Sequence, residues 1–135
     1  MKLPRHAINA LLAFSVGWAT TAYAQNAWVR VKGGTWEPEA QVLSELKVQL
    51  APYAQGRAQA EGRKLRNWNE YTFQYQGLEE KGRKFVLVNA LCHKDRGWNL
   101  EQQMILVLDG GSCFFRLKFD PQRRQYFDLT INGEA

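Results

Sequence analysis

The chain has 135 residues, which is enough for one domain of ordinary size. It is 45% hydrophobic, 13% aromatic and 23% charged, a composition that excludes a collagen-like chain, a disordered chain and a long coiled coil. The formal net charge of +5 suits solubility and a mild attraction to anionic polymers. Composition therefore places the chain among small globular domains and identifies no activity.

Residues 1–24 have the pattern of a cleavable signal peptide. Two basic residues come first, residues 10–20 are almost wholly apolar or small, and Ala22-Tyr23-Ala24 has the small residues of a signal-peptidase site. The apolar run is shorter than the roughly 20 residues of a spanning helix, although an uncleaved anchor helix is the alternative. We expect cleavage after Ala24, a single domain over residues 25–135, and a periplasmic or secreted protein.

The expected domain is only mildly basic. The leader holds two of the 18 basic residues and none of the 13 acidic ones, so the domain has a net charge of +3. This charge is too small for the dense basic surface of a nucleic-acid-binding domain. We therefore expect no nucleic-acid partner, and no stable membrane insertion once the leader is removed.

The first predicted elements are a short strand and a helix. Residues 27–31 alternate in polarity and indicate a short edge strand, and Thr35 and Pro38 suit the N-cap and first turn of a helix. Pro52 should stop or bend this helix, and we expect residues 54–67 to form a frayed helix or a solvated connection. The apolar stripe that predicts the helix has helical period and consists of Val42, Leu43, Leu46, Leu50 and Tyr53.

From Trp68 onward the period changes to two, which is typical of strands. This pattern predicts one N-terminal amphipathic helix packed on a four-stranded, or five-stranded, antiparallel sheet in an α+β domain. The arrangement is similar to the cystatin-like superfold. Apolar strand segments occur at residues 71–76, 85–91, 104–108, 113–119 and 127–131, with turn sequences at residues 79–82, 109–112 and 120–123.

The two cysteines favour a disulfide, but the strand pattern opposes it. An even cysteine count in an exported protein indicates one bond, here between Cys92 and Cys113. If residues 104–108 form an intervening strand, the two cysteines lie at opposite ends of the sheet, about 20 Å apart. A disulfide requires Cα atoms within about 7 Å. We expect the disulfide on the strength of the compartment, with free thiols or misplaced strand limits as the alternatives.

Motifs for catalysis are missing from the sequence. His93 is the one histidine after the leader, and there is no nucleophile elbow, zinc-protease motif, phosphate loop or dinucleotide fingerprint. We therefore expect no cofactor, no bound metal and no catalytic residue. A zinc site from Cys92, His93 and Cys113 has no standard spacing. A glycosidase pair from Asp109 and the carboxylates Glu79 and Glu80 is conceivable, but predicted turns explain these residues.

Two sets of residues are candidates for binding. Trp98 lies in a polar loop beside Lys94 and Arg96, and tryptophan and arginine are favoured at binding hot spots, so we expect this set to contact a protein. Packing in a small core is the alternative for Trp98. The second set is a basic run that could bind an anionic polymer or glycan, although a solvated face is the usual explanation. It consists of Arg57, Arg63, Lys64, Arg66 and Trp68.

Three segments of the C-terminal half carry a resemblance. Asn89-Ala90-Leu91-Cys92, Asp109-Gly110-Gly111-Ser112-Cys113-Phe114-Phe115 and Asn132-Gly133-Glu134-Ala135 resemble a group of small, exported, uncharacterised proteins of Gram-negative bacteria. The likeness covers about the last 60 residues and the tyrosine strand at residues 71–75. No activity is assigned to this group, so it implies no catalytic residues. It implies export and an intramolecular role for the cysteines.

These observations predict an exported, non-enzymatic binding module. The expected partner is a protein of the cell envelope, so the domain would serve as an inhibitor, an immunity factor or a subunit of an envelope complex. The alternative is a binder of anionic envelope polymers or glycans. A small hydrolase is the least favoured function, because the catalytic motifs are missing.

Overall fold

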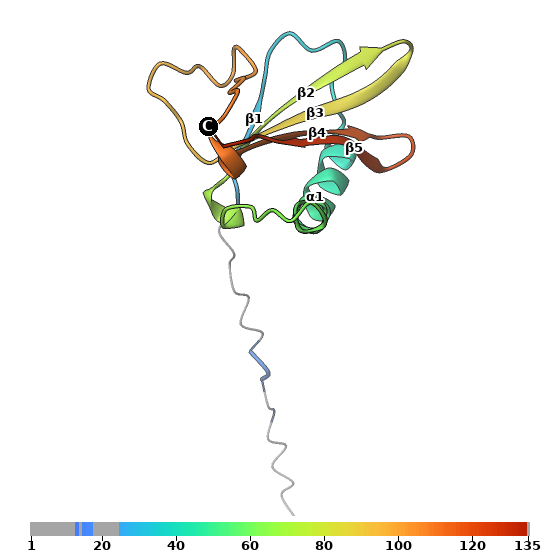
Figure 1. Ribbon diagram of the computed structural model, residues 1–135. Coiled ribbons are helices and arrows are strands. Elements are labelled where there is room, and N and C mark those ends of the chain that lie inside the picture. The colour runs from blue at the N-terminus through green and yellow to red at the C-terminus, as the bar shows by residue number, and fades with distance from the viewer. Residues whose placement is uncertain (1–12, 14, 18–24, 135) are drawn as a thin grey trace, which may run out of the picture.

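The computed structural model describes residues 13, 15–17 and 25–134. The expected cleavage site at Ala24 and nearly all of the expected leader lie outside these residues. No helix in the described ranges is long and apolar enough to cross a membrane. The elements, in chain order, are β1 (Trp28–Arg30), α1 (Ala40–Ala60), β2 (Thr72–Glu80), β3 (Arg83–Leu91), β4 (Phe114–Asp120) and β5 (Gln125–Ile131), with short 3-10 turns at Trp68–Glu70 and Gly111–Cys113 (Figure 1).

The strands form one sheet in the order β1-β2-β3-β4-β5. β1 pairs with β2 in parallel, and the other neighbours are antiparallel. The α+β class is therefore confirmed. The sheet has five strands, the alternative count, and it is mixed rather than wholly antiparallel. Parallel pairing needs a long crossover connection, and α1 with its flanking loops provides one between β1 and β2.

The predicted strand at residues 104–108 is wrong. β3 pairs directly with β4, with Leu91 opposite Phe114, so the segment lies in the long connection between these two strands. Its apolar residues alternate in burial as those of a strand do, with Ile105 buried and Leu106 exposed. Its backbone, however, bonds to side-chain amides of the sheet instead of to a neighbouring strand.

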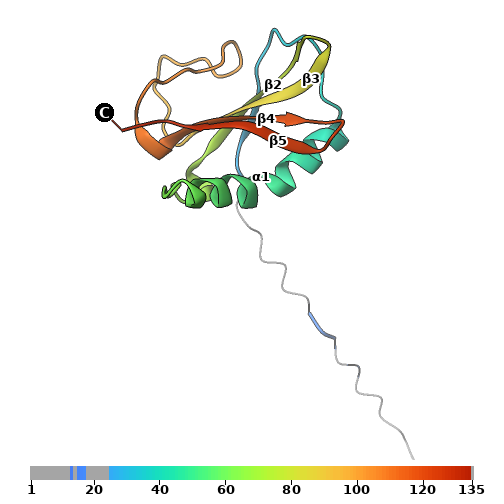
Figure 2. The same ribbon diagram turned by 45° about the vertical axis from the view of Figure 1, so that its right-hand side comes forward.

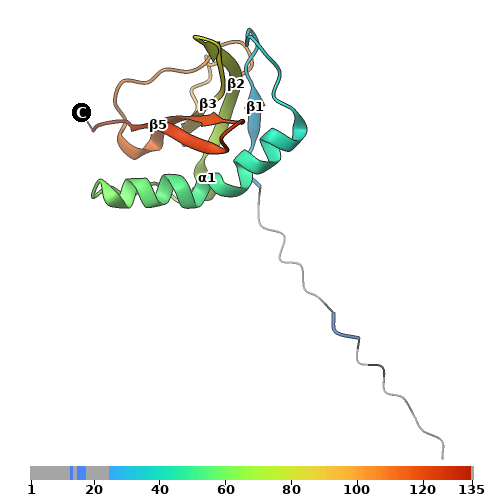
Figure 3. The same ribbon diagram turned by 90° about the vertical axis from the view of Figure 1, so that its right-hand side faces the viewer.

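The helix is longer than the sequence pattern predicts. It begins at Ala40 without a side-chain cap, and Thr35, the expected cap, instead donates its backbone N–H to the Gly77 carbonyl oxygen over 2.9 Å. Pro52 lies inside the helix, which continues to Ala60 and bends along its length (Figure 3). The exposed position of Pro52 leaves the buried side of the helix free to stay in contact with the sheet.

α1 crosses one face of the sheet and forms the main core with it (Figure 2). The helix buries residues spaced four apart, which continue the predicted stripe past Pro52. A β-bulge between Arg116 and Lys118 lets β5 direct Tyr126 and Leu129 to this core, while Phe127 packs on Phe85 across the opposite face. The core residues of α1 are Leu46, Leu50, Ala54 and Ala58, and those of the central strands include Phe73, Val86, Val88, Ala90, Phe115, Leu117 and Phe119.

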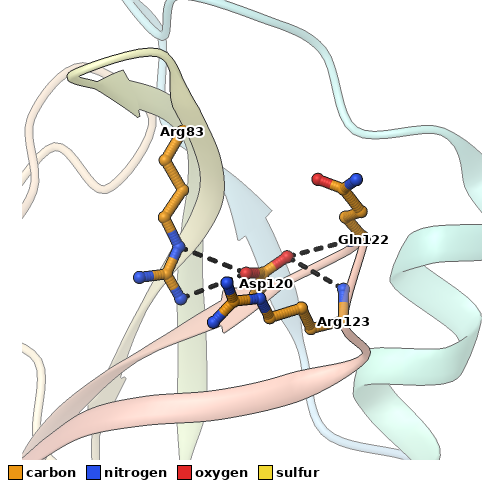
Figure 4. A network of polar contacts seen from close by, with 4 residues as sticks. All are labelled: Arg83, Asp120, Gln122 and Arg123. Atoms are coloured by element: carbon orange, nitrogen blue, oxygen red, sulfur yellow. Dashed lines mark hydrogen bonds and ion pairs between the residues drawn. The ribbon is translucent and has the colours of Figure 1, made fainter.

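The predicted turn after β4 is organised by Asp120, which is only 3% exposed. Its Oδ1 accepts the backbone N–H groups of Gln122 and Arg123, at 2.9 and 3.0 Å, and its Oδ2 pairs with the Arg83 guanidinium at 3.1 Å (Figure 4). Burial by itself raises the pKa of Asp120, but the two backbone donors and Arg83 together lower it below its ordinary value. The carboxylate thus ties the β4–β5 turn to the start of β3.

Candidate functional site

The expected disulfide is confirmed between Cys92 and Cys113, whose Cα atoms are 4.9 Å apart. The two residues follow β3 and precede β4, next to the last antiparallel pair of these strands. The Cys92 N–H also donates to the Cys113 carbonyl oxygen over 2.9 Å. The conflict with the strand pattern disappears because residues 104–108 form no strand between them. The bond closes the base of residues 93–112, which we name the closed loop.

The closed loop lies over the open face of the sheet, which is the face opposite α1 (Figure 2). Two buried amide side chains of the sheet fix its path. Gln74 Nε2 donates to the carbonyl oxygens of Leu100 and Gln103, at 2.9 and 2.8 Å. Asn89 Nδ2 donates to the Ile105 carbonyl oxygen at 2.7 Å. The loop therefore has fixed anchor points on both β2 and β3.

A third amide fixes the end of the closed loop. Asn132, directly after β5, donates from Nδ2 to the carbonyl oxygens of Val107 and Asp109, at 2.6 and 2.8 Å. The loop also has a small apolar core of its own. Because buried polar networks with satisfied partners are rigid, we expect the loop to be ordered before any partner binds. The residues of this core are Leu91, Ile105, Cys113 and Phe114, with Cys92, Trp98, Leu100 and Val107 packed against them.

The first predicted binding set lies in the first half of the closed loop, directly after Cys92. Lys94 and Arg96 are exposed. Trp98 is half-buried, with its ring centroid 6.4 Å from that of Phe114, so it contributes to the core of the loop as well as to its surface. His93 bonds to Asp95 over 2.7 Å and holds the turn between them.

Two leucines of the closed loop were missed as candidate binding residues. Leu106 is 60% exposed and Leu108 is 88% exposed. Both lie between residues whose backbone carbonyls are held by Asn89 and Asn132. The alternating burial of residues 105–108 has the period that predicted a strand there. The sequence pattern therefore showed that these residues point to two sides, but it did not show which side faces solvent. Because their backbone is held in place, these two exposed apolar side chains are the candidate contact residues of the closed loop.

The second predicted binding set is largely brought together. A hollow of about 500 Å³ opens between α1 and the segment after it, and we name it the basic hollow. Arg57 does not line it. Arg63 ties the segment after α1 to the end of β5. Its guanidinium donates to the carbonyl oxygens of Ile131, at 2.9 Å, and of Asn132. Its lining includes Gln55, Gln59, Arg63, Lys64, Arg66 and Trp68.

The geometry argues against two specific sites, a zinc site at the cysteines and a glycosidase pair from Asp109 and Glu79. The disulfide occupies both thiols that a zinc site with His93 would need, and no cluster of three potential metal ligands occurs in the part of the chain that the structure describes. Glu79 lies seven residues along β2 from Thr72, whereas Asp109 contacts Asn132, at the end of the sheet where β2 begins. The two carboxylates are therefore about 20 Å apart, which is too far for the acid–base pair of a glycosidase.

No protein-family model, curated protein or solved structure matches the chain.

Proposed function

We propose that the protein is an exported, non-enzymatic module that binds a protein partner of the cell envelope through the closed loop. The observation that carries the proposal is the pair of exposed leucines, Leu106 and Leu108, on a loop fixed by a disulfide and by three buried amides. A loop that is already ordered loses little conformational entropy on binding, which favours affinity.

The partner is expected to have an apolar pocket with carboxylates beside it. Each leucine that becomes buried contributes about 2 kcal/mol, and Lys94 and Arg96 of the same loop attract acidic groups at the rim. Trp98 packs on Phe114 in the apolar core of the same loop. Such a surface suits an inhibitor, an immunity factor or a subunit of an envelope complex.

The disulfide supports export, because disulfides persist in oxidising compartments such as the periplasm and the extracellular space. The resemblance to exported proteins of Gram-negative bacteria supports the same location. The cystatin-like architecture stays a prediction that fits one helix across one sheet face. The alternative function, binding of anionic polymers, depends on the basic hollow, a different surface.

The test is affinity capture from a cell-envelope extract with the purified protein, analysed by mass spectrometry at two salt concentrations. We expect one protein in stoichiometric amount at both concentrations. A variant with Leu106→Ser and Leu108→Ser should lose it, whereas Val48→Ser should retain it, because Val48 is a similarly exposed apolar residue, 74% accessible, on α1. Equal retention by both variants would remove the closed loop as the binding surface.

A further inference from the structure

We infer that the basic hollow binds an acidic saccharide, one that carries carboxylate or phosphate groups. This function goes beyond the proposed binding of a protein, because the basic hollow and the closed-loop leucines lie on separate segments. The hollow contains Arg63, Lys64 and Arg66, and no acidic residue lines it. Lys64 and Arg66 are exposed. The described part of the chain pairs neither of them with a carboxylate, so their charge is available to a ligand.

Arg63 gives the basic hollow a fixed positive charge. Two of its N–H groups donate to backbone carbonyls at the end of β5, and a guanidinium has five such donors, so it keeps further donors for an anion. Glu134 lines an adjoining hollow together with Arg63 and Lys64. The acidic groups of the ligand are therefore expected on the side of Arg66, away from this carboxylate.

Trp68 gives the basic hollow a rigid aromatic surface. Its ring is half-buried and packs against the edge of Tyr71 and, tilted, against Phe73, with centroid distances of 5.7 and 5.3 Å. Gln55, Gln59 and Asn67 line the same hollow. A side-chain amide both donates and accepts hydrogen bonds, as recognition of sugar hydroxyl groups requires. An aromatic face, amides and cations together fit a saccharide with acidic groups better than a simple anion, for which the amides and the ring have no use.

The test measures binding by titration calorimetry at low and at high salt. The probes are a hexamer of galacturonic acid, a phosphorylated core oligosaccharide of lipopolysaccharide, a neutral galactose hexamer and a single-stranded DNA oligomer. We expect one of the two acidic saccharides to bind and the neutral hexamer to bind more weakly. The variant with Lys64→Gln and Arg66→Gln should bind about tenfold more weakly at low salt. The matched variant with Lys94→Gln and Arg96→Gln removes the same charges from the closed loop and should bind normally.

Three results would overturn the inference. The first is that neither acidic saccharide binds even at low salt. The second is that the two double variants lose affinity equally, which indicates attraction by net charge alone. The third is that the DNA oligomer binds as tightly as the saccharides, because the hollow would then select only charge. Gln59→Ala provides an independent check at an exposed position of α1. It leaves the charge unchanged and should still weaken saccharide binding, while protein capture through the closed loop is unaffected.

Discussion

Asn89 Nδ2 donates a hydrogen bond of 2.9 Å to Gln74 Oε1 beneath the closed loop. The same Gln74 oxygen accepts the backbone N–H of Ile105 at 3.0 Å, and both side chains are almost fully buried. The side chains of two neighbouring strands therefore satisfy the backbone of a loop segment that is not itself paired with a strand. The conformation of the closed loop depends on this pair.

The first prediction concerns this amide pair. Asn89→Leu removes the side-chain donor to the buried Ile105 carbonyl oxygen, and the loss should lower the free energy of unfolding by about 2 kcal/mol. Urea denaturation measures the loss, and hydrogen exchange of the Ile105 amide should become faster. Gln76→Leu removes one hydrogen bond at a more exposed site on the same face and should cost less than about 1 kcal/mol. An equal loss in both variants would contradict a special role for Asn89.

The disulfide should stabilise the fold measurably. The cysteines are 21 residues apart in sequence, and closing a loop of this length contributes about 3 kcal/mol in the chain-entropy model. We expect a variant with Cys92→Ser and Cys113→Ser to unfold at a lower temperature than the oxidised protein. The reductant dithiothreitol should lower the melting temperature of the wild type and leave that of the variant unchanged. A wild-type melting temperature that does not respond to dithiothreitol would show that the bond does not form.

Much of the fold could be predicted from the sequence, because local periodicity and local packing agree there. The stripe of α1 and the alternation of β2 and β4 point to the side chains that form the main core. The end of the helix was missed for two reasons. Pro52 was expected to stop or bend the helix, and Ala54 and Ala58, which continue the spacing of Leu46 and Leu50, are weak in any hydrophobic pattern. Their burial depends on the sheet.

The closed loop could not be predicted in the same way. Gln74 and Asn89 are polar residues in strands, and the sequence pattern does not show that they are buried and bonded to a segment far away. Residues 104–108 alternate as a strand would, and the pattern cannot tell whether a strand or side-chain amides satisfy the backbone. Leu106 and Leu108 are exposed because side-chain amides, and not a neighbouring strand, hold this segment. The candidate site could therefore be identified only in the folded structure.

A close backbone contact predicts that Gly77 cannot be replaced. A Cβ atom at this position would lie 2.2 Å from the Trp36 carbonyl oxygen, so β2 and the β1–α1 loop would have to separate. Gly77→Ala should destabilise the protein by about 3 kcal/mol, as measured by urea denaturation. Gly56 is the matched control, since no atom lies within 4 Å of its added Cβ. Gly56→Ala, inside α1, should instead stabilise the protein by about 0.5 to 1 kcal/mol.

Asp120 predicts a specific loss of stability in acid. Its pKa is lower in the folded protein than its ordinary value of 3.8, so its stabilising contribution is complete above that value and is lost as the pH falls through the folded pKa. Asp120→Asn should lower the free energy of unfolding at neutral pH by about 2 kcal/mol. The difference between variant and wild type should shrink as the pH falls below 3.8. A difference that is constant with pH would show that the Asp120 charge does not contribute.

The binding role of the closed loop is tested most directly by photo-cross-linking in cells. Leu108→benzoylphenylalanine places a photoreactive group at the most exposed apolar position of the loop, and Val48→benzoylphenylalanine places it on α1 at another exposed apolar position. We predict that irradiation joins the Leu108 variant to one partner protein, identified by mass spectrometry, and that the Val48 variant gives no such product. The same product from both variants, or no product from the Leu108 variant, would contradict a protein-binding surface on the closed loop.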